Sequence, residues 1–210
     1  MSDSLWLIPL GYLVGSVPFG LVIARAVAGV DVRKTGSGNI GATNVLRVVG
    51  SKAGALTLAL DALKGWAPVA LGQLLGAPEL LVATIGLAAF LGHLYPLFLG
   101  FRGGKGVSTA LWVLVALFAK IALLIVGVWL VTAALFRYSS LAALVTAVAA
   151  PFLVWGLDGR LPYVGLTVMI CGFILARHRE NVSRLIAGHE GKIGKKLHGA
   201  DLPRHDRLAS

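Results

Sequence analysis

The segment from Val107 to Phe136 reads V-S-T-A-L-W-V-L-V-A-L-F-A-K-I-A-L-L-I-V-G-V-W-L-V-T-A-A-L-F, an apolar run with one charge, Lys120, near its middle. As a single helix its roughly 30 residues would extend about 45 Å, well beyond a hydrocarbon core of about 30 Å. An ammonium group at the bilayer centre costs at least about 2.5 kcal/mol, whereas a turn at the membrane surface avoids that cost. We therefore predict two shorter helices, over about 107–119 and 121–136.

Further apolar runs approach the roughly 20 residues that a spanning helix needs, and they fall at 5–27, 53–75, 79–98, 139–157 and 162–177. Together with the divided run they predict an all-α polytopic integral membrane protein with seven transmembrane helices. The composition, 57% hydrophobic and 13% charged, excludes an ordinary soluble domain. No basic residue precedes Arg25, so the first helix is expected to stay in the protein and not to be a cleaved signal peptide.

The positive charges favour seven crossings over six. With seven, all 19 lysines and arginines except Lys64, Lys120 and Arg160 lie on one face or in its loops. The positive-inside rule makes that face cytoplasmic, with the N-terminus outside and the C-terminus in the cytoplasm. Six crossings would divide the basic segments between the two faces. The net charge of +10 lies beside apolar spans, so the expected partners are lipid headgroups and anionic substrates, not nucleic acid.

The first cytoplasmic loop, Asp31 to Arg47, reads D-V-R-K-T-G-S-G-N-I-G-A-T-N-V-L-R and is dense in glycine, hydroxyl and amide residues. Its candidate ligand-binding groups are the hydrogen-bonding side chains of Ser37, Asn39, Thr43 and Asn44 and the guanidinium of Arg47, which suits phosphate or carboxylate. The alternative is a solvated loop in which Ser37 or Thr43 caps a short helix.

A second polar segment, Gly100 to Val107, reads G-F-R-G-G-K-G-V. Glycines allow a backbone to approach an anion closely, and two cations add charge that a phosphate neutralises. The candidate phosphate-binding residues are Arg102, Gly103, Gly104, Lys105 and Gly106. The alternative is a common glycine-rich linker whose basic residues only follow the positive-inside rule.

A third segment follows the last apolar run and reads R-H-R-E-N-V-S-R-L-I-A-G-H-E-G-K-I-G from Arg177 to Gly194. His178 and Asn181 share one face if the helix continues, although a lone histidine is also a common interfacial anchor. Within the second run, Asp61 and Lys64 stand at i and i+3, either as a structural ion pair or in contact with substrate. Ser140 is a further candidate hydrogen-bond donor.

Common catalytic signatures are missing from the sequence. It has no G-x-S-x-G elbow, no H-E-x-x-H and no Cys/His cluster with zinc spacing, and its single cysteine, Cys171, lies in an apolar run. It also lacks the H-x-x-x-x-D signature of acyl-CoA-using glycerolipid acyltransferases. We therefore expect no metal, no cofactor and no covalent enzyme intermediate.

Three long motifs in order carry a family resemblance: S-G-N-I-G-A-T-N-V-L-R (Ser37 to Arg47), G-H-L-Y-P-L-F-L-G-F-R-G-G-K-G-V (Gly92 to Val107) and R-H-R-E-N-V-S-R-L (Arg177 to Leu185). They closely resemble the PlsY family, the acyl-phosphate:glycerol-3-phosphate acyltransferases of bacterial phospholipid synthesis. The resemblance begins at G-S-V-P-F-G, Gly15 to Gly20, and ends near Gly194. We expect one domain over 1–196, followed by a mobile tail over 197–210.

The resemblance implies a seven-helix enzyme of the bacterial cytoplasmic (inner) membrane with its active site on the cytoplasmic face. The implied reaction transfers an acyl group from acyl-phosphate to the 1-hydroxyl of sn-glycerol 3-phosphate, giving 1-acyl-sn-glycerol 3-phosphate (lysophosphatidic acid) and phosphate. The implied catalytic residues are Ser37, Arg47, Lys105, His178 and Asn181, with Gly103, Gly104 and Gly106 shaping the phosphate loop. Asn39, Thr43, Asn44, Lys64, Arg102 and Ser140 are expected to add contacts.

A membrane permease or flippase for an anionic, phosphate-bearing solute is the alternative function. Transporters bind their substrates near the bilayer midplane, often between internal repeats, whereas here the polar groups gather in loops on one face and no internal repeat is evident. The choice of acyl-phosphate over acyl-CoA or acyl-carrier protein as the donor rests on the family resemblance. The sequence predicts neither acyl-chain length preference nor oligomeric state.

Overall fold

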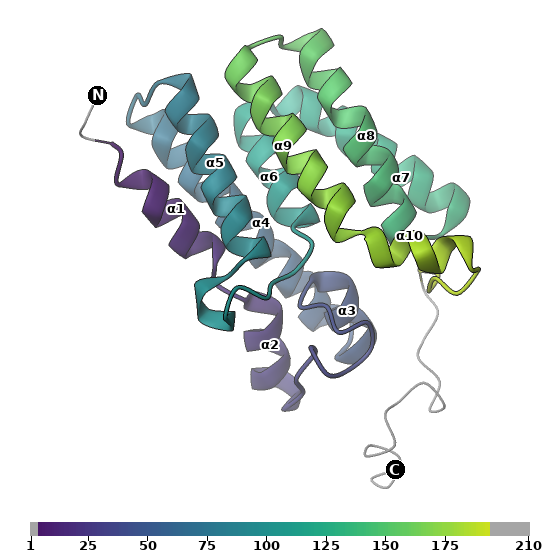
Figure 1. The fold of residues 1–210 in the computed structure, drawn as a ribbon. Coiled ribbons are helices and arrows are strands. Elements are labelled where there is room, and N and C mark those ends of the chain that lie inside the picture. The colour runs from purple at the N-terminus through teal and green to yellow at the C-terminus, as the bar shows by residue number, and fades with distance from the viewer. Residues whose placement is uncertain (1–3, 194–210) are drawn as a thin grey trace, which may run out of the picture.

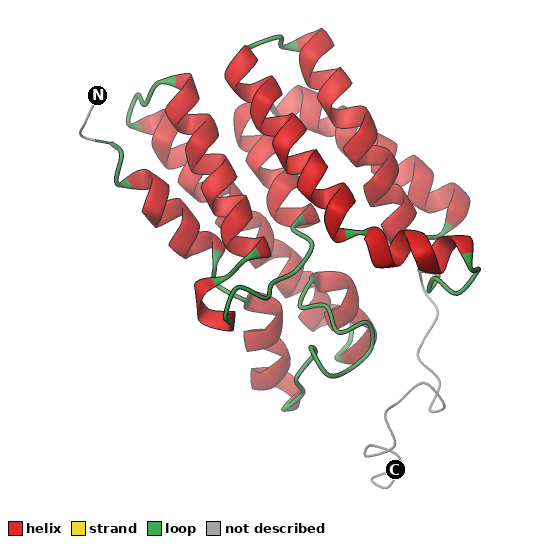
Figure 2. Ribbon diagram, in the orientation of Figure 1, coloured by secondary structure: helices red, strands yellow, loops and turns green. Residues whose placement is uncertain are grey.

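A computed structural model describes residues 4–193 of the chain; residues 1–3 and 194–210, which include the predicted tail over 197–210, lie outside the described part. The described residues form helices and loops without a strand (Figure 2). In chain order the elements are α1 (Leu7–Gly15), α2 (Phe19–Ala28), α3 (Ala42–Val48), α4 (Ser51–Leu74), α5 (Glu79–Leu94), η1 (Leu97–Leu99), α6 (Val107–Leu117), α7 (Ala119–Phe136), α8 (Ser139–Leu157), α9 (Leu161–Arg177) and α10 (Arg179–Ile186).

The predicted division of the 107–136 run is confirmed. Helix α6 ends at Leu117 and α7 begins at Ala119, so the break falls just before Lys120. The residue between the two helices, Phe118, has φ −155° and ψ 82°, far from helical values. The side chain of Lys120 is exposed, which agrees with the expectation that its ammonium is not buried at the centre of a helix.

The chain is interrupted at two further places. The first run, predicted as one helix over 5–27, is broken between Gly15 and Phe19, where Pro18 has no N–H to donate to a continuing helix. The last run, predicted over 162–177, is confirmed as α9, and the chain then bends by 52° before α10, with His178 at the bend. Both interruptions lie at the same end of the bundle as α3 and η1 (Figure 1).

The outer surface of the bundle is apolar, as expected for helices that face lipid. Among the described residues, four helical segments are long and apolar enough to cross a membrane, or five if the bent pair of α9 and α10 counts as one. Large side chains such as Leu123, Leu135, Phe152 and Trp155 project outward from α7 and α8. The chain is therefore a multi-pass helical membrane protein, and α6, with 11 residues, is an apolar helix too short to be counted among these segments.

A buried ion pair on α4 (Ser51–Leu74) contacts the break between α1 and α2. The Lys64 ammonium lies 2.8 Å from the Asp61 carboxylate and donates over 2.8 Å to the carbonyl oxygen of Val17, between α1 and α2. The two charged side chains are only 1% and 4% exposed. From α6, the Thr109 hydroxyl donates over 3.0 Å to the backbone carbonyl of Asp61 and lies 3.2 Å from Nδ1 of His93 on α5. Polar contacts thus tie α1, α4, α5 and α6 together inside the bundle.

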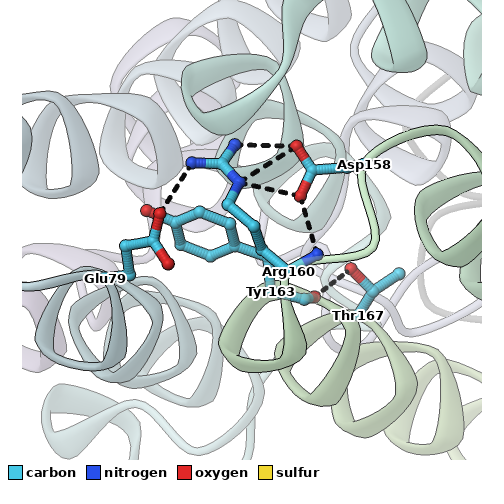
Figure 3. Close-up of polar contacts among 5 residues, drawn as sticks. All are labelled: Glu79, Asp158, Arg160, Tyr163 and Thr167. Carbon is cyan, nitrogen blue, oxygen red and sulfur yellow. Dashed lines mark hydrogen bonds and ion pairs between the residues drawn. The ribbon is translucent and has the colours of Figure 1, made fainter.

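A second ion-pair cluster lies at the opposite end of the bundle (Figure 3). Arg160, between α8 and α9, pairs with Asp158 over 2.7 Å and with Glu79, the first residue of α5, over 3.0 Å. Its guanidinium carbon lies 4.5 Å from the centre of the Tyr163 ring. These partly exposed pairs contribute little stability, but they neutralise the charge of Arg160.

The buried pair gives a test of what holds this half together. We expect Lys64→Ala to lower the free energy of unfolding by about 3–5 kcal/mol, because it leaves the Asp61 carboxylate buried and uncompensated. The double variant Asp61→Asn/Lys64→Met removes both charges and is expected to recover most of that loss. Thermal unfolding in detergent measures both variants, and a double variant no more stable than Lys64→Ala would contradict this explanation.

Candidate active site

The first loop is folded around one buried amide, that of Asn44 on α3. Asn44 is 1% exposed, and its Nδ2 donates to the carbonyl oxygens of Val32, Thr35 and Asn39 at 3.0, 3.1 and 2.8 Å. Its Oδ1 accepts the backbone N–H of Ser37 over 2.9 Å. These contacts use the hydrogen-bonding capacity of the amide, so Asn44 shapes the loop and holds Ser37 at its exposed surface.

The glycine-rich loop is fixed by the residues on either side of it. The N–H groups of Gly103 and Gly104 donate to the carbonyls of Leu94 and His93 at the end of α5, over 3.0 and 3.2 Å. The guanidinium of Arg177 donates to the carbonyls of Gly103 and Gly104, the shortest of these bonds being 2.8 Å. The N–H groups of these two glycines are therefore occupied in this structure. The expected role of these two glycines in phosphate binding stays a prediction.

The anion-binding capacity of this loop lies instead where it enters α6. Gly106 has φ +76°, a left-handed conformation that glycine adopts easily, and it is the N-cap of α6. The first N–H groups of a helix have no partner within it, and they favour an anion together with a neighbouring cation. Lys105 directly precedes this N-terminus and supplies that cation.

Five side chains from four segments form a hydrogen-bonded group that we call the Glu190 cluster: Lys105, Ser140, Asn181, Arg184 and Glu190. The Lys105 ammonium donates to Oδ1 of Asn181, and Nδ2 of Asn181 donates to Glu190 over 2.7 Å. The Ser140 hydroxyl and Nε of Arg184 each donate to Glu190 over 2.7 Å. The structure thus brings together three predicted site residues, Lys105, Ser140 and Asn181, through one shared carboxylate.

Burial, nearby charges and hydrogen bonds shift the pKa values of two residues of the cluster. Burial, with help from the nearby charge of Arg184, lowers the pKa of Lys105 to about 8. Burial works against ionisation of Glu190, but the hydrogen bonds from Ser140, Arg184 and Asn181 outweigh it and lower the pKa of that carboxyl. At neutral pH the cluster therefore holds an ammonium group that is only partly solvated.

Two further predicted residues lie beside this cluster. His178, 3% exposed at the bend before α10, donates from Nδ1 to the carbonyl of Ile174 over 2.8 Å, so that in the neutral ring Nε2 is the acceptor. Burial lowers the pKa of His178 to about 4. Arg47 on α3 donates over 3.1 Å to the carbonyl of Gly191, next to Glu190, and so joins the first loop to the C-terminal segment.

Other predicted residues lie apart from the cluster. Lys64 is occupied by Asp61 and Val17 inside the bundle, which favours the structural alternative for that pair. Arg102 belongs to a separate depression of about 350 Å³, whose lining includes Arg33, Lys34, Ile40, Leu99 and Gly103. Asn39 accepts the N–H of Gly41 within its own loop, and Thr43 is exposed on α3. No group of three or more His, Cys, Asp or Glu residues arranged for a metal was found in the described part of the chain.

Three residues that organise the site were not among the predicted site residues. Glu190 gathers the cluster, Arg177 holds two carbonyls of the glycine-rich loop, and the His93 ring lies directly against Gly104. Arg177 and Glu190 lie within the third polar segment, but their partners are far away in sequence. Only the packing of α5, α8 and α9 brings them together.

The contact between Gly104 and His93 is open to a direct test. A Cβ at Gly104 would collide with Nε2 of His93, a buried ring that its neighbours hold in place. We expect Gly104→Ala to displace the loop and to reduce the acyl transfer that the three motifs imply by at least about tenfold, with folding retained. The matched control is Gly172→Ala on α9, where the added methyl group meets nothing within 4 Å. Equal activity of the two variants would contradict the assigned role of the loop.

Comparison with known proteins shows the family of the chain. A family model described as glycerol-3-phosphate acyltransferase matches residues 5–188. The glycerol-3-phosphate acyltransferase of Mesorhizobium japonicum is 53% identical over 187 residues, which cover 89% of this chain and 94% of that protein. The corresponding protein of Ralstonia nicotianae is 50% identical over 192 residues, covering 88% and 91%.

Solved structures extend the agreement to three dimensions. The crystal structure of PlsY (YgiH), an integral membrane glycerol 3-phosphate acyltransferase in its glycerol 3-phosphate form, superposes with a TM-score of 0.88 at 41% identity. The match covers 92% of this chain and 96% of that one. Its lysophosphatidic acid form gives a TM-score of 0.85. The resemblance predicted from the three motifs is confirmed, and the chain belongs to the PlsY family of glycerol-3-phosphate acyltransferases.

Proposed function

We propose that the acyl donor of this glycerol-3-phosphate acyltransferase is an acyl-phosphate and that the product is 1-acyl-sn-glycerol 3-phosphate, released with inorganic phosphate. The observation that carries the proposal is the position of Lys105, a partly buried ammonium at the N-terminus of α6, held by Asn181 of the Glu190 cluster. This arrangement suits a phosphate group that gains charge as it leaves. The related PlsY structures contain glycerol 3-phosphate and lysophosphatidic acid forms, which agrees with the proposed acceptor and product.

The proposed chemistry needs no acyl-enzyme. An acyl-phosphate is a mixed anhydride with a good leaving group, so the 1-hydroxyl oxygen can attack the acyl carbon directly. The new C–O ester bond forms as the bond from the acyl carbon to the phosphate oxygen breaks. The hydroxyl proton goes to a phosphate oxygen, whose second pKa of about 6 suits the transfer. The enzyme then contributes position and charge, through Lys105, Arg47 and Asn181, with His178 and Ser37 as orienting groups.

Activity measurements test this donor. In purified protein we expect phosphate release from palmitoyl-phosphate that depends on added glycerol 3-phosphate. Lys105→Ala is expected to lower the rate by about 10²–10³, the range for loss of one transition-state donor. Lys52→Ala, which removes an exposed lysine from the start of α4, is the matched control and is expected to retain activity.

Two outcomes would decide against the proposal. Turnover with acyl-CoA or acyl-carrier protein but not with palmitoyl-phosphate would assign another donor. No turnover at all, together with uptake of glycerol 3-phosphate into proteoliposomes, would favour the permease or flippase.

Substitution of His178 tests whether this residue orients the substrate or acts as a general base. Because its pKa is about 4, the ring is neutral above pH 5, and it is a weak base. We expect His178→Gln to retain measurable activity, with the same pH dependence of kcat as the parent protein between about pH 3.5 and 7, a range that spans this pKa. A general base would instead impose an acid limb near pH 4 that the substitution removes, and would account for about 10²–10⁴ in rate. Complete loss of turnover with unchanged binding of glycerol 3-phosphate would assign the base to His178.

We also propose seven crossings, with the N-terminus outside, the C-terminus in the cytoplasm and the active site on the cytoplasmic face of the bacterial inner membrane. The separation of charge supports this orientation. Arg33, Lys34, Arg47, Arg102 and Lys105 lie in loops and on α3 at the end of the bundle near α10, whereas Arg160 at the other end is neutralised by carboxylates.

Cysteine labelling tests the orientation. In a Cys171→Ala background, Lys52→Cys is expected to react with an impermeant maleimide only after the cells are opened. Lys120→Cys, equally exposed in the structure, is expected to react in intact cells. Labelling of both positions from the same side would contradict the odd number of crossings proposed between Lys52 and Lys120.

A further inference from the structure

A cationic depression separate from the Glu190 cluster lies between the first loop and the segment that follows η1. It has a volume of about 350 Å³, and three of its lining side chains are the cations Arg33, Lys34 and Arg102. Ile40 and Leu99 contribute apolar walls, and Gly103 closes the side nearest the glycine-rich loop. None of the residues of the Glu190 cluster is among the residues that line this depression.

The positive charge of this depression is only partly compensated. Asp31 accepts from Arg33 at 2.9 and 2.6 Å and from Arg25 at 2.9 Å, so one carboxylate serves two guanidinium groups. Within residues 4–193 neither Lys34 nor Arg102 forms an ion pair with a carboxylate. An excess of cations remains at a concave surface, where walls of low dielectric strengthen the field.

The backbone keeps this surface in place without a ligand. The N–H of Gly103 donates to the carbonyl of Leu94, and its carbonyl accepts from Arg177. In the first loop the buried amide of Asn44 fixes the carbonyls of Val32 and Thr35, which flank the two cations Arg33 and Lys34. The cations are therefore carried by two constrained loops, and little backbone ordering is left for a ligand to bring about.

We propose that this depression, which Gly103 lines and Lys105 does not, is a second phosphate site that binds a phosphate monoester dianion. Arginine forks and a lysine ammonium are the groups that recognise such a dianion, and the neighbouring apolar walls accommodate a small organic substituent. The ligand is either a soluble phosphate monoester or the monoester headgroup of a membrane lipid. The proposal extends the proposed function, since acceptor and product both carry this group, but its test requires no turnover.

Binding of inorganic phosphate measures the site directly. Titration of the full-length protein in detergent, followed by ³¹P NMR or calorimetry, is expected to reveal two phosphate sites. The double variant Arg33→Gln/Lys34→Gln is expected to weaken one of them by about tenfold, as for loss of charged hydrogen bonds, and Lys105→Ala is expected to weaken the other. Lys52→Gln, which removes one charge outside the depression, is the control and is expected to leave both sites intact.

Single variants and lipid nanodiscs complete the test. Lys34→Gln alone removes an exposed side chain without described partners, so it remains informative if loss of the Arg33–Asp31 contact impairs folding. Competition by glycerol 3-phosphate added to nanodiscs of neutral lipid identifies a soluble ligand. Competition only by nanodiscs that contain lysophosphatidic acid identifies a lipid headgroup.

The result that would overturn the proposal is a single phosphate site, or two sites that the Arg33, Lys34 and Lys52 variants affect equally. Either result is independent of acyl transfer. A protein that binds two phosphates but does not use palmitoyl-phosphate would keep the second site and reject the proposed donor. A protein with one phosphate site and full activity with palmitoyl-phosphate would keep the proposed donor and reject the second site.

Discussion

The ion pair between Lys64 and Asp61 is the constraint on which the rest of the structure depends. A charge buried among apolar helices persists only when its partners are fixed, and Lys64 is bound both to Asp61 and to the carbonyl of Val17 at the break between α1 and α2. Through Thr109 the same group of contacts reaches His93, and the His93 ring lies directly against Gly104. The shape of the glycine-rich loop is thus determined inside the bundle and not at its surface.

The loop in turn places cations on two sides of one rigid segment. Lys105 faces Asn181 and the Glu190 cluster, whereas Arg102 lines the cationic depression. Arg177 holds the carbonyls between them. This order gives a physical reason for the unusual concentration of glycine: only a residue without a Cβ can pass so closely over the end of α5 while its neighbours on either side point in different directions.

Much of the fold was predictable from the sequence because membrane helices follow simple rules of length and charge. The break near Lys120 followed from the cost of burying one ammonium, and Phe118 provides it. Pro18 is a local signal for the interruption of the first run, because it cannot donate to a continuing helix, although the run was predicted as one helix. The bend at His178 depends on packing at the end of the bundle, which no local pattern specifies. The motifs predicted Lys105 and Asn181 as site residues, and Ser140 was a further candidate donor at the start of its apolar run. Glu190, which joins them, was not among the predicted site residues, because a carboxylate that accepts from three side chains has no spacing signal in the sequence.

The N–H groups of Gly103 and Gly104, in the loop predicted to bind phosphate, have partners within the protein that the sequence did not indicate. Both groups donate to carbonyls at the end of α5, which would otherwise lack partners at a helix C-terminus. The composition of a glycine-rich loop indicates close backbone approach, but it does not say whether the partner is a ligand or a neighbouring helix. Here the helix takes that role. The groups of this loop that remain to contact an anion are the N-terminus of α6 and the cations Lys105 and Arg102. These groups are in position without a substrate.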